Sequence, residues 1–267
     1  MGKIFTFYKK TKGNARVTTC MALVGTYIGK YTGKTVAITQ IGEHGIFAEE
    51  IFGNIKRTNG SKTNMSGING LMLLLKGGML TRNKIMSCGV RVGNGNIFLF
   101  PGDIKASDNQ KGTEKIRRFL YTQISECFDI LLIDAGYRGN SDEIYGDGVC
   151  VIQQDLNTAR EICLSEQKKA SMFIMNGFME NSVNSKKKFL RVFGAQIHFI
   201  PMDAGIFDAC LYGRIMNFFG ILDLIFGNIK ELEVLEAVGN AVNEIMKTVN
   251  KENTEEVFDE DNVCLEM

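Results

Sequence analysis

KIFTFYKKTKGNARVTTCMALVGTYIGKYTGKTVAITQ, residues 3–40, is the stretch that decides the fold. Lys3–Tyr8 is a short run rich in β-forming residues, and Lys9–Val17 is polar and contains a glycine. The nearly uncharged run Cys20–Gly29 is long enough for a buried helix, and Val36–Ile41 reads as the next strand. A strand–loop–helix–strand unit of this kind places its loop and helix N-terminus at the carboxyl edge of a parallel sheet, where anions bind.

The rest of the chain repeats the alternation of strands and helices. Further strands are predicted at 96–103, 128–136, 148–153, 170–176 and 196–201, and helices at 114–128, 157–166, 182–192, 208–226 and 229–249. Residues 84–92 fit a short strand or a connecting segment equally well. The alternation predicts an α/β fold with a mostly parallel central sheet and helices on both faces. We expect one domain over residues 1–250 and an acidic, flexible tail over 251–267.

The composition excludes several classes of protein. Apolar residues make up 45% of the 267 positions, and the net charge is only +1, so no global field draws the chain onto nucleic acid or an anionic membrane. The seven cysteines form no CxxC pair, which favours buried, reduced thiols in a cytoplasmic protein. With two histidines and no cysteine pair, we expect no metal site built from these residue types. We also expect no signal peptide and no membrane-spanning helix.

The loop after the first strand carries a recognisable motif. KGNARVTT, residues 12–19, resembles the deviant Walker A motif K-G-G-x-G-K-T-T of the ParA/MinD family of P-loop ATPases. Lys12, Gly13, Thr18 and Thr19 match the motif, and Ala15 stands at its variable position. Asn14 and Arg16 stand where the family has glycines, and Val17 stands where it has the phosphate-binding lysine.

Three further landmarks follow in the order of that family. NIFLFPGD (96–103) resembles the strand that leads to Walker B, and FDILLIDAG (128–136) resembles the Walker B strand with Asp134 at its aspartate. FIMNGF (173–178) and HFIPMD (198–203) resemble the strands that end in a base-binding asparagine, here Asn176, and a proline, here Pro201. The resemblance covers about residues 3–205.

The resemblance implies a role for each matching residue. It implies that residues 13–17 hold the phosphates of ATP or ADP, that Thr18 and Asp134 serve Mg²⁺, and that Lys12 reaches the nucleotide of a partner subunit in a homodimer. The residues by themselves leave simpler alternatives open. Thr18 or Thr19 could cap a helix, and Asn176 could belong to an Asn-Gly turn. Lys12 could be an ordinary loop lysine, and Asp134 an exposed acid at a strand end.

The departures from the motif decide the functional hypothesis. Valine at position 17 cannot neutralise phosphate charge as a lysine ammonium does. Gln40 and Gly42 also stand where the family has the D-x-D acids that position water and metal. We therefore expect a degenerate member with weak or absent hydrolysis, acting as a dimeric localisation or partition scaffold. TadZ/CpaE-like proteins of pilus and secretion systems are the nearest in character, and a conjugation or plasmid-maintenance setting fits equally well.

Two other functions stay open from the sequence. In the first, the protein is a working partition ATPase in which Lys12 and Arg16 serve the phosphates, because a guanidinium suits phosphate geometry. In the second, it is a protein-interaction module that uses the fold without nucleotide.

The densest basic cluster is Lys186, Lys187, Lys188 and Arg191. It could hold nonspecific DNA through phosphate contacts, or it could be a solvated helix face. The last predicted helix is followed by acidic residues, which an anionic membrane surface would repel, so we expect no membrane insertion there.

Overall fold

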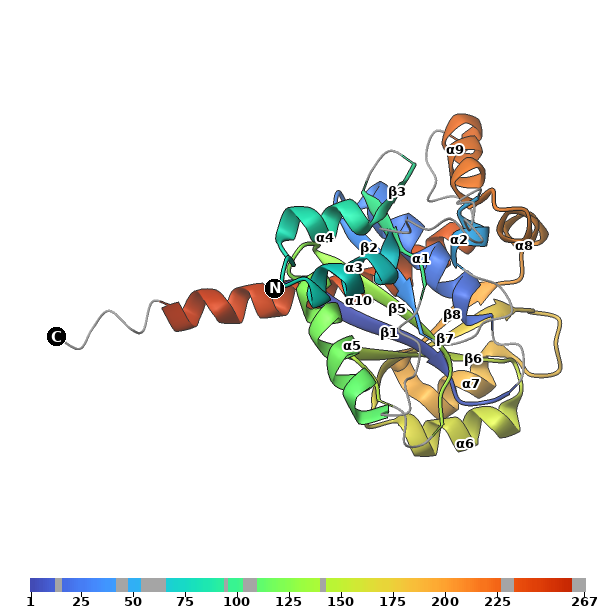
Figure 1. The fold of residues 1–267 in the computed structure, drawn as a ribbon. Helices are drawn as coiled ribbons and strands as arrows, with labels where there is room; N and C mark the ends of the chain where they lie inside the picture. The colour runs from blue at the N-terminus through green and yellow to red at the C-terminus, as the bar shows by residue number, and fades with distance from the viewer. Residues whose placement is uncertain are drawn as a thin grey trace.

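The computed structural model describes residues 1–12, 16–41, 48–53, 66–93, 96–102, 110–139, 143–226 and 233–260. They contain one eight-stranded sheet in the order β3-β4-β2-β5-β1-β6-β7-β8 (Figure 1). All neighbouring strands run parallel except β3, which is antiparallel to β4. The strands are β1 Lys3–Lys9, β2 Val36–Gln40, β3 Val90–Val92, β4 Ile97–Phe100, β5 Ile130–Tyr137, β6 Asp147–Ile152, β7 Ala170–Phe178 and β8 Ile197–Pro201. The predicted mostly parallel α/β fold is confirmed.

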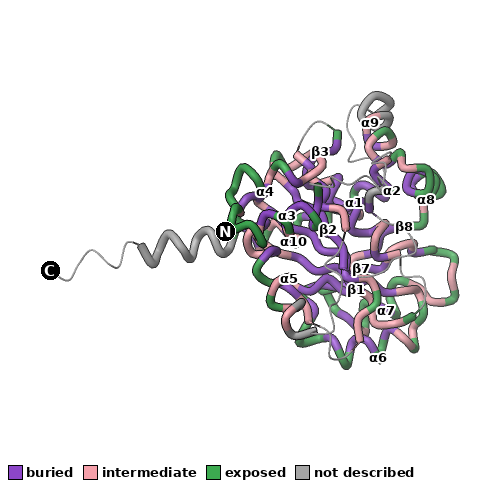
Figure 2. The backbone as a smooth tube through the Cα atoms, in the orientation of Figure 1, coloured by how far each residue is buried: buried purple, intermediate pink, exposed green. Residues whose placement is uncertain are grey.

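Helices cover both faces of the sheet. One apolar cluster joins the sheet to α1 Val17–Tyr31, α2 Ala48–Ile51, α8 Ala204–Leu211, α9 Ile215–Phe226 and α10 Glu233–Glu260. A second cluster joins the other face to α3 Gly67–Lys76, α4 Arg82–Cys88, α5 Gln110–Ser125, α6 Leu156–Glu166 and α7 Lys186–Phe193. The sheet is therefore the middle of three layers, and Figure 2 shows its strands mostly buried.

The apolar run in β5 explains why this strand is central. Ile130 and Leu132 pack into the α1 side of the core, and Leu131 and Ile133 into the α5 side. All four side chains are fully buried. A parallel strand covered on both faces needs a continuous apolar run rather than an alternating one, as the sequence predicts.

The topology has a switch point beside β1. From β1 the chain crosses through α1 to β2, which lies on the β5 side of β1. The β6–α6–β7 connection runs to the opposite side. Ligands of open α/β sheets bind outside the carboxyl ends of the strands where the connections diverge in this way. That point lies between the carboxyl ends of β1 and β6.

The structure corrects several predicted boundaries. Residues 84–92 contain the end of helix α4 and the short antiparallel strand β3. The single helix predicted over 208–226 is two helices, α8 and α9, separated at Gly213. There the backbone has φ 64°, and an added Cβ would lie 2.5 Å from the carbonyl oxygen of Glu50. The helix predicted to end at 249 continues to Glu260, and Figure 1 shows its end projecting from the body.

The predicted core faces are mostly confirmed. The helical period predicts an apolar stripe on α10, and the structure buries it: Leu235, Val238, Val242, Ile245 and Val249. Six cysteines are buried and form no disulfide: Cys20, Cys88, Cys127, Cys150, Cys163 and Cys210.

The same period predicts that Ile116, Phe119, Leu120, Ile124 and Cys127 share one face of the helix over 114–128. That prediction is wrong at Phe119, which is 46% exposed. Tyr121 is buried in that helix instead, with its ring 4.9 Å from the ring of Tyr145. In the described part of the chain, no helix is long and apolar enough to span a bilayer.

Candidate functional site

The entry to the loop is held by a buried polar network. The Lys10 ammonium lies 3.2 Å from Oε1 of Glu166 and donates a hydrogen bond to the carbonyl of Gly139 at 2.9 Å. The hydroxyl of Tyr8 donates to the other Glu166 oxygen at 2.9 Å. Burial, with Cys150 and Glu166 as further causes, raises the pKa of Tyr8 far above its ordinary value. Lys10 therefore anchors the end of β1, and its charge is already paired.

The exit from the loop keeps a backbone conformation that suits glycine. Arg16 has φ 53° and ψ 46°, and it is the only non-glycine residue of the described chain with a positive φ. It is the N-cap of α1, although its side chain makes no capping bond. The backbone at position 16 is thus left-handed, a conformation that glycine adopts most easily. The deviant Walker A motif has glycine at this position, and this chain has arginine.

The side chain of Arg16 reaches over the ends of β7 and β8. Its Nη1 lies 2.9 Å from the sulfur of Met202, and its guanidinium lies 4.9 Å from the ring centre of Phe207. The amide of Asn176 donates to the carbonyl of Arg16 at 3.2 Å. Three segments that are far apart in the sequence therefore meet at the carboxyl edge, and Pro201 ends β8 beside them.

Asn176 does not end its strand, as the Asn-Gly turn alternative would require. β7 continues through Gly177, which has φ 80°, to Phe178, and its pairing with β8 is irregular at this point. The amide of Asn176 is hydrogen-bonded to the backbone at the start of α1, so the turn alternative is wrong.

Asp134 is a buried residue under the first turn of α1. It pairs in register with Phe7 and Gln40, is 0% exposed, and accepts a hydrogen bond from the backbone N–H of Gly136 at 2.9 Å. Burial, and then the nearby Asp134 carboxylate, raise the pKa of the Cys20 thiol in that turn. The alternative of an exposed acid at a strand end is therefore wrong.

Gln40 is buried and has a structural partner. Its Oε1 accepts a hydrogen bond from the N–H of Ala48, the first residue of α2, at 3.1 Å. Gln40 stands where the family has an acid of the D-x-D pair, and its side chain is hydrogen-bonded to the first residue of α2. Gly42, the other position, lies outside the described residues, as do Gly13, Asn14 and Ala15 of the loop.

The remaining loop residues lie around the start of α1. Val17 is the first helical residue and is only 4% exposed, so its side chain is part of the core. Thr18 and Thr19 are half-buried in the first turn. The capping alternative for them is wrong, because the N-cap is Arg16. Lys12 is exposed.

These residues fit the phosphates of a nucleotide only in part. The N-terminus of α1 offers backbone N–H groups and a positive dipole end at the carboxyl edge of the sheet. Thr18 and the buried Asp134 carry oxygen atoms, the kind of ligand that Mg²⁺ prefers. No ammonium is available at position 17. Among the described residues, no group of three or more His, Cys, Asp or Glu side chains is arranged for a metal ion.

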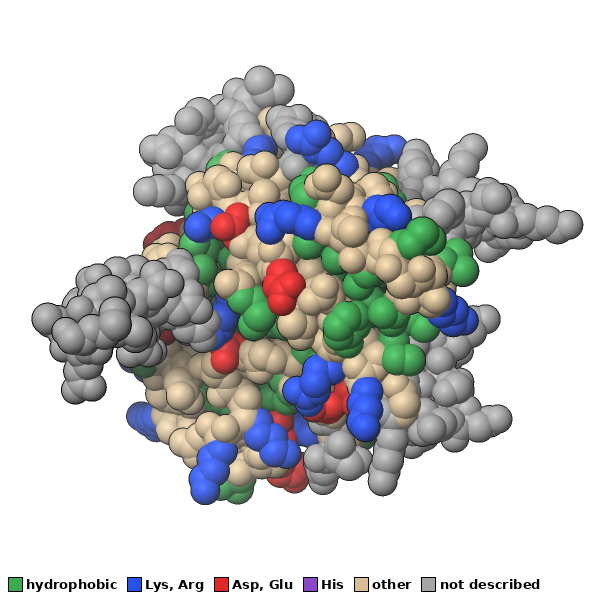
Figure 3. Space-filling view, turned by 60° about the vertical axis from the view of Figure 1, so that its left-hand side comes forward, with side chains coloured by type: hydrophobic (Ala, Val, Ile, Leu, Met, Phe, Trp, Pro, Cys, Tyr) green, Lys and Arg blue, Asp and Glu red, His purple; other side chains and the backbone are tan. Residues whose placement is uncertain are grey.

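The basic cluster on α7 is exposed as predicted, with all four cations at the surface. Lys186 lies 5.2 Å from the ring centre of Phe199, and Lys188 donates to the carbonyl of Val183 at 3.0 Å. On the face drawn in Figure 3, Lys and Arg side chains are interspersed with Asp and Glu.

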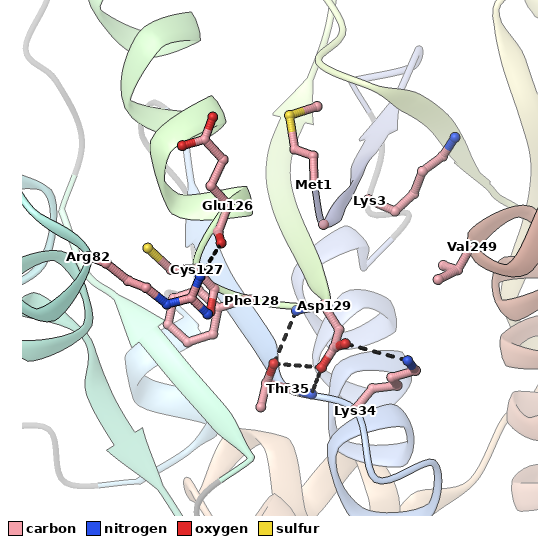
Figure 4. Close-up of a pocket in the computed structure, with 11 residues that line it drawn as sticks. Met1, Lys3, Lys34, Thr35, Arg82, Glu126, Cys127, Phe128, Asp129 and Val249 are labelled. Atoms are coloured by element: carbon pink, nitrogen blue, oxygen red, sulfur yellow. Dashed lines mark hydrogen bonds and ion pairs between the residues drawn. The ribbon is translucent and has the colours of Figure 1, made fainter. Parts of the chain in front are cut away.

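A hollow of about 320 Å³ lies at the opposite, amino edge of the sheet (Figure 4). Asp129 and Thr35 line this hollow and form a pair of hydrogen bonds, called the clasp below. The N–H and the hydroxyl of Thr35 donate to the Asp129 carboxylate at 2.8 and 2.7 Å. Burial opposes the charge on Asp129, but the bonds from Thr35 and the charge of Lys34 outweigh it, and the pKa of Asp129 lies below its ordinary value. The clasp joins β5 to the start of β2, and no predicted site residue lies there.

Several of these groups had no signal in the sequence. Lys10 and Glu166 became visible only when the fold brought them together, and Met202 and Phe207 read as ordinary apolar residues. The alternation of strands and helices could have placed Met202 at a carboxyl strand end, but not beneath a guanidinium.

Comparison with known proteins adds the class of fold. No family model matches the sequence, and no curated protein matches it. The structure is similar to a ParA family ATPase from Chlorobium tepidum, with a TM-score of 0.63 and 13% identity over 91% of this chain and 99% of that one. It is similar to MinD in the MinC:MinD cell division complex of Aquifex aeolicus, with a TM-score of 0.63 and 17% identity over 92% and 96%.

A third similar structure contains a nucleotide analogue. It is a plasmid partition protein from Borrelia burgdorferi bound to AMPPNP, with a TM-score of 0.59 and 12% identity over 93% of this chain and 100% of that one. The chain therefore has the fold of the P-loop ATPases. Within that class, its fold is that of the ParA and MinD proteins.

Proposed function

We propose that this chain is a degenerate ParA/MinD-like protein that binds ATP or ADP weakly, hydrolyses ATP slowly or not at all, and acts as a dimeric scaffold for localisation or partition. The observation that carries the proposal is the contrast at the start of α1. The backbone at Arg16 keeps the left-handed exit of a phosphate loop, while the next side chain, Val17, is buried in the core. We infer from this contrast a helix start that can still meet phosphates but has no ammonium at position 17.

The neighbouring positions support the same reading. Gln40 holds the start of α2 instead of offering a carboxylate to metal or water. Lys10, the nearest buried cation, is neutralised by Glu166. Loss of hydrolysis with retention of the fold follows if no lysine or acid is free to take part in phosphoryl transfer.

A bound nucleotide with Mg²⁺ would bring negatively charged phosphates and a divalent cation to the start of α1. The first turn of α1 would hold the phosphates through backbone N–H groups. Thr18 and Asp134 would serve the metal, and Asn176 and Pro201 lie on the side where the base would lie. Lys12, exposed beside the loop, would extend toward a second subunit.

The first test is calorimetric titration of the purified chain with ATP and with ADP in Mg²⁺, with light scattering to follow its oligomeric state. We expect binding in the micromolar to millimolar range, a shift toward dimer with ATP, and little release of phosphate. An ATPase rate in the range of about 1 s⁻¹ that Asp134→Ala abolishes would contradict the loss of hydrolysis. Absence of binding at millimolar nucleotide would overturn the proposal itself.

The same assay tests the alternative of an active partition ATPase. That function requires Lys12→Ala and Arg16→Ala each to abolish phosphate release. In the structure Arg16 points to Met202 and Phe207 instead, which favours the degenerate scaffold.

The partner and the setting are part of the proposal. The Aquifex protein is seen in complex with MinC, and the Borrelia protein is a plasmid partition protein. By analogy we propose a cytoplasmic protein with a protein partner in a partition, conjugation, pilus or secretion system. Nonspecific DNA would bind, if at all, on the exposed cations of α7. Binding to a random duplex that weakens steeply with salt, and that is lost on replacing Lys186–Lys188 by alanine, would support that contact.

A further inference from the structure

The side chain of Arg16 occupies a small platform at the carboxyl edge of the sheet. The platform consists of the Met202 thioether and the Phe207 ring, and both side chains are partly exposed, at 43% and 38%. The guanidinium contacts both of them. Without it, more of the aromatic face and of the thioether would be open to solvent at the carboxyl edge of the sheet.

The backbone around the platform fixes the position of Arg16. The Asn176 amide holds its carbonyl, and the N–H of Cys20 donates to the same carbonyl at 3.0 Å. Gly177 lies below the guanidinium, where an added Cβ would be 3.4 Å from Nη1. The guanidinium therefore lies at van der Waals distance from the place that a Cβ at Gly177 would take.

The platform also lies in the path of a ligand. The carboxyl ends of the parallel strands β1, β7 and β8 lie at the same edge of the sheet, and α1 starts there. A ligand whose charged end meets the first turn of α1 and whose ring extends past the ends of β7 and β8 would meet the Arg16 side chain, because the guanidinium contacts Met202 and Phe207 there. A planar ring and a planar guanidinium compete for the same aromatic face, because both stack on it.

We propose that Arg16 is a latch that covers a ring-stacking platform made by Phe207 and Met202, and that a nucleotide base binds there after displacing the guanidinium. This inference rests on the proposed nucleotide binding and adds how access to the site is controlled. Opening the latch costs the contacts of the guanidinium, so the observed affinity is reduced by the small fraction of molecules in which the platform is open. Partner binding that draws Arg16 away would raise nucleotide affinity.

The test compares the affinity of ADP with Mg²⁺ for four forms of the full chain. Arg16→Ala should bind about fivefold more tightly than the wild type, because an exposed cation–π contact of that size no longer has to be broken. Phe207→Ala should bind more weakly, because the base loses its stacking surface. Leu164→Ala, a control at an 85% exposed position on α6, should bind as the wild type does. Equal or weaker binding by Arg16→Ala would overturn the latch while leaving nucleotide binding intact.

A second readout reports the latch directly. In protein with ¹³C-labelled methionine methyl groups, the Met202 signal, assigned from Met202→Leu, should shift in Arg16→Ala, and ADP added to the wild type should shift it too. A Met202 signal that ADP leaves unmoved while ADP binds would overturn the inference. If neither the wild type nor Arg16→Ala binds ADP, nucleotide binding and the latch both fall. A Met202 shift in Arg16→Ala would then show only that the side-chain contact exists.

Discussion

Lys10 and Glu166 form a buried ion pair at the end of β1, with 3.2 Å between the ammonium and Oε1. The two side chains are 9% and 0% exposed, so neither charge is well solvated. The pair joins the start of the phosphate-loop region to the last residue of α6, and the Tyr8 hydroxyl completes it. The loop therefore starts from a position that the core fixes.

Removing one partner of this pair should destabilise the fold strongly. Glu166→Gln keeps the shape and an acceptor for Tyr8 but leaves the Lys10 charge buried without a counter-charge. We expect a loss of about 3 kcal/mol in the free energy of unfolding, measured by urea denaturation. The double variant Lys10→Met, Glu166→Gln should recover part of that loss, since no buried charge remains. A single variant within about 1 kcal/mol of the wild type would contradict a buried, uncompensated charge.

The left-handed backbone at Arg16 predicts an order of stability between two variants. Arg16→Gly and Arg16→Ala both lose the contacts with Met202 and Phe207, so their difference reports the backbone alone. We expect the glycine variant to be more stable by about 1 kcal/mol, because alanine is strained at φ 53°. Thermal or urea unfolding of the pair measures it. An alanine variant equal to or more stable than the glycine variant would show that the backbone at this position relaxes.

The hydrogen bond from Ala48 to Gln40 predicts a difference between two replacements. Gln40→Leu fills a similar volume but leaves a buried N–H unpaired, and it should cost about 2 kcal/mol. Gln40→Glu keeps an oxygen in place and should cost less near neutral pH. Urea denaturation of both variants measures the difference. Equal losses would mean that the N–H finds another acceptor.

The buried thiols predict a loss of stability in alkali. In the unfolded chain thiols ionise near their ordinary pKa of 9.0, whereas burial raises the pKa of Cys20 and Cys150 well above it and that of Cys210 to about 12. The folded state keeps protons that the unfolded state releases. The contribution is complete below pH 9.0 and is lost as pH rises from there toward the folded pKa values, by about 1.4 kcal/mol per pH unit for each thiol.

Unfolding in urea from pH 7 to 10.5, with reductant present, checks the prediction. Cys150→Ala removes one of the titrating groups and should reduce the alkaline slope by about one proton. A free energy of unfolding that stays flat to pH 10.5 would contradict the burial of these thiols.

The sheet was predictable from the sequence because its signals are local. The continuous apolar run in β5 and the stripe of α10 each follow from periodicity, and the structure buries both. The break between α8 and α9 was not predictable, because both halves are apolar and the reason for the turn is the close approach of Gly213 to Glu50. Phe119 was misplaced because Tyr121, two positions away in the same helix, could be buried against Tyr145 instead.

The candidate site was predictable only as positions along the chain. Sequence places Arg16 after the loop, Asp134 in a buried strand and Asn176 at the end of another strand. It gives no sign that the Asn176 amide holds the Arg16 carbonyl, because that contact joins β7 to α1. It also gives no sign that Gln40 serves a helix start, since the same residue type is common on surfaces. Contacts between distant segments depend on the register and the twist of the sheet. The periodicity of apolar residues along the sequence does not determine either of them.

The two edges of the sheet differ in how they are protected from other chains. An open strand edge is a template for intermolecular pairing. At one edge the outermost strand, β3, has only 3 residues and runs against the direction of the others, so it offers a poor template. At the other edge β8 has 5 residues, and α10 lies against it. The sheet therefore ends on one side in a strand too short to pair well, and on the other in a strand that packs against α10.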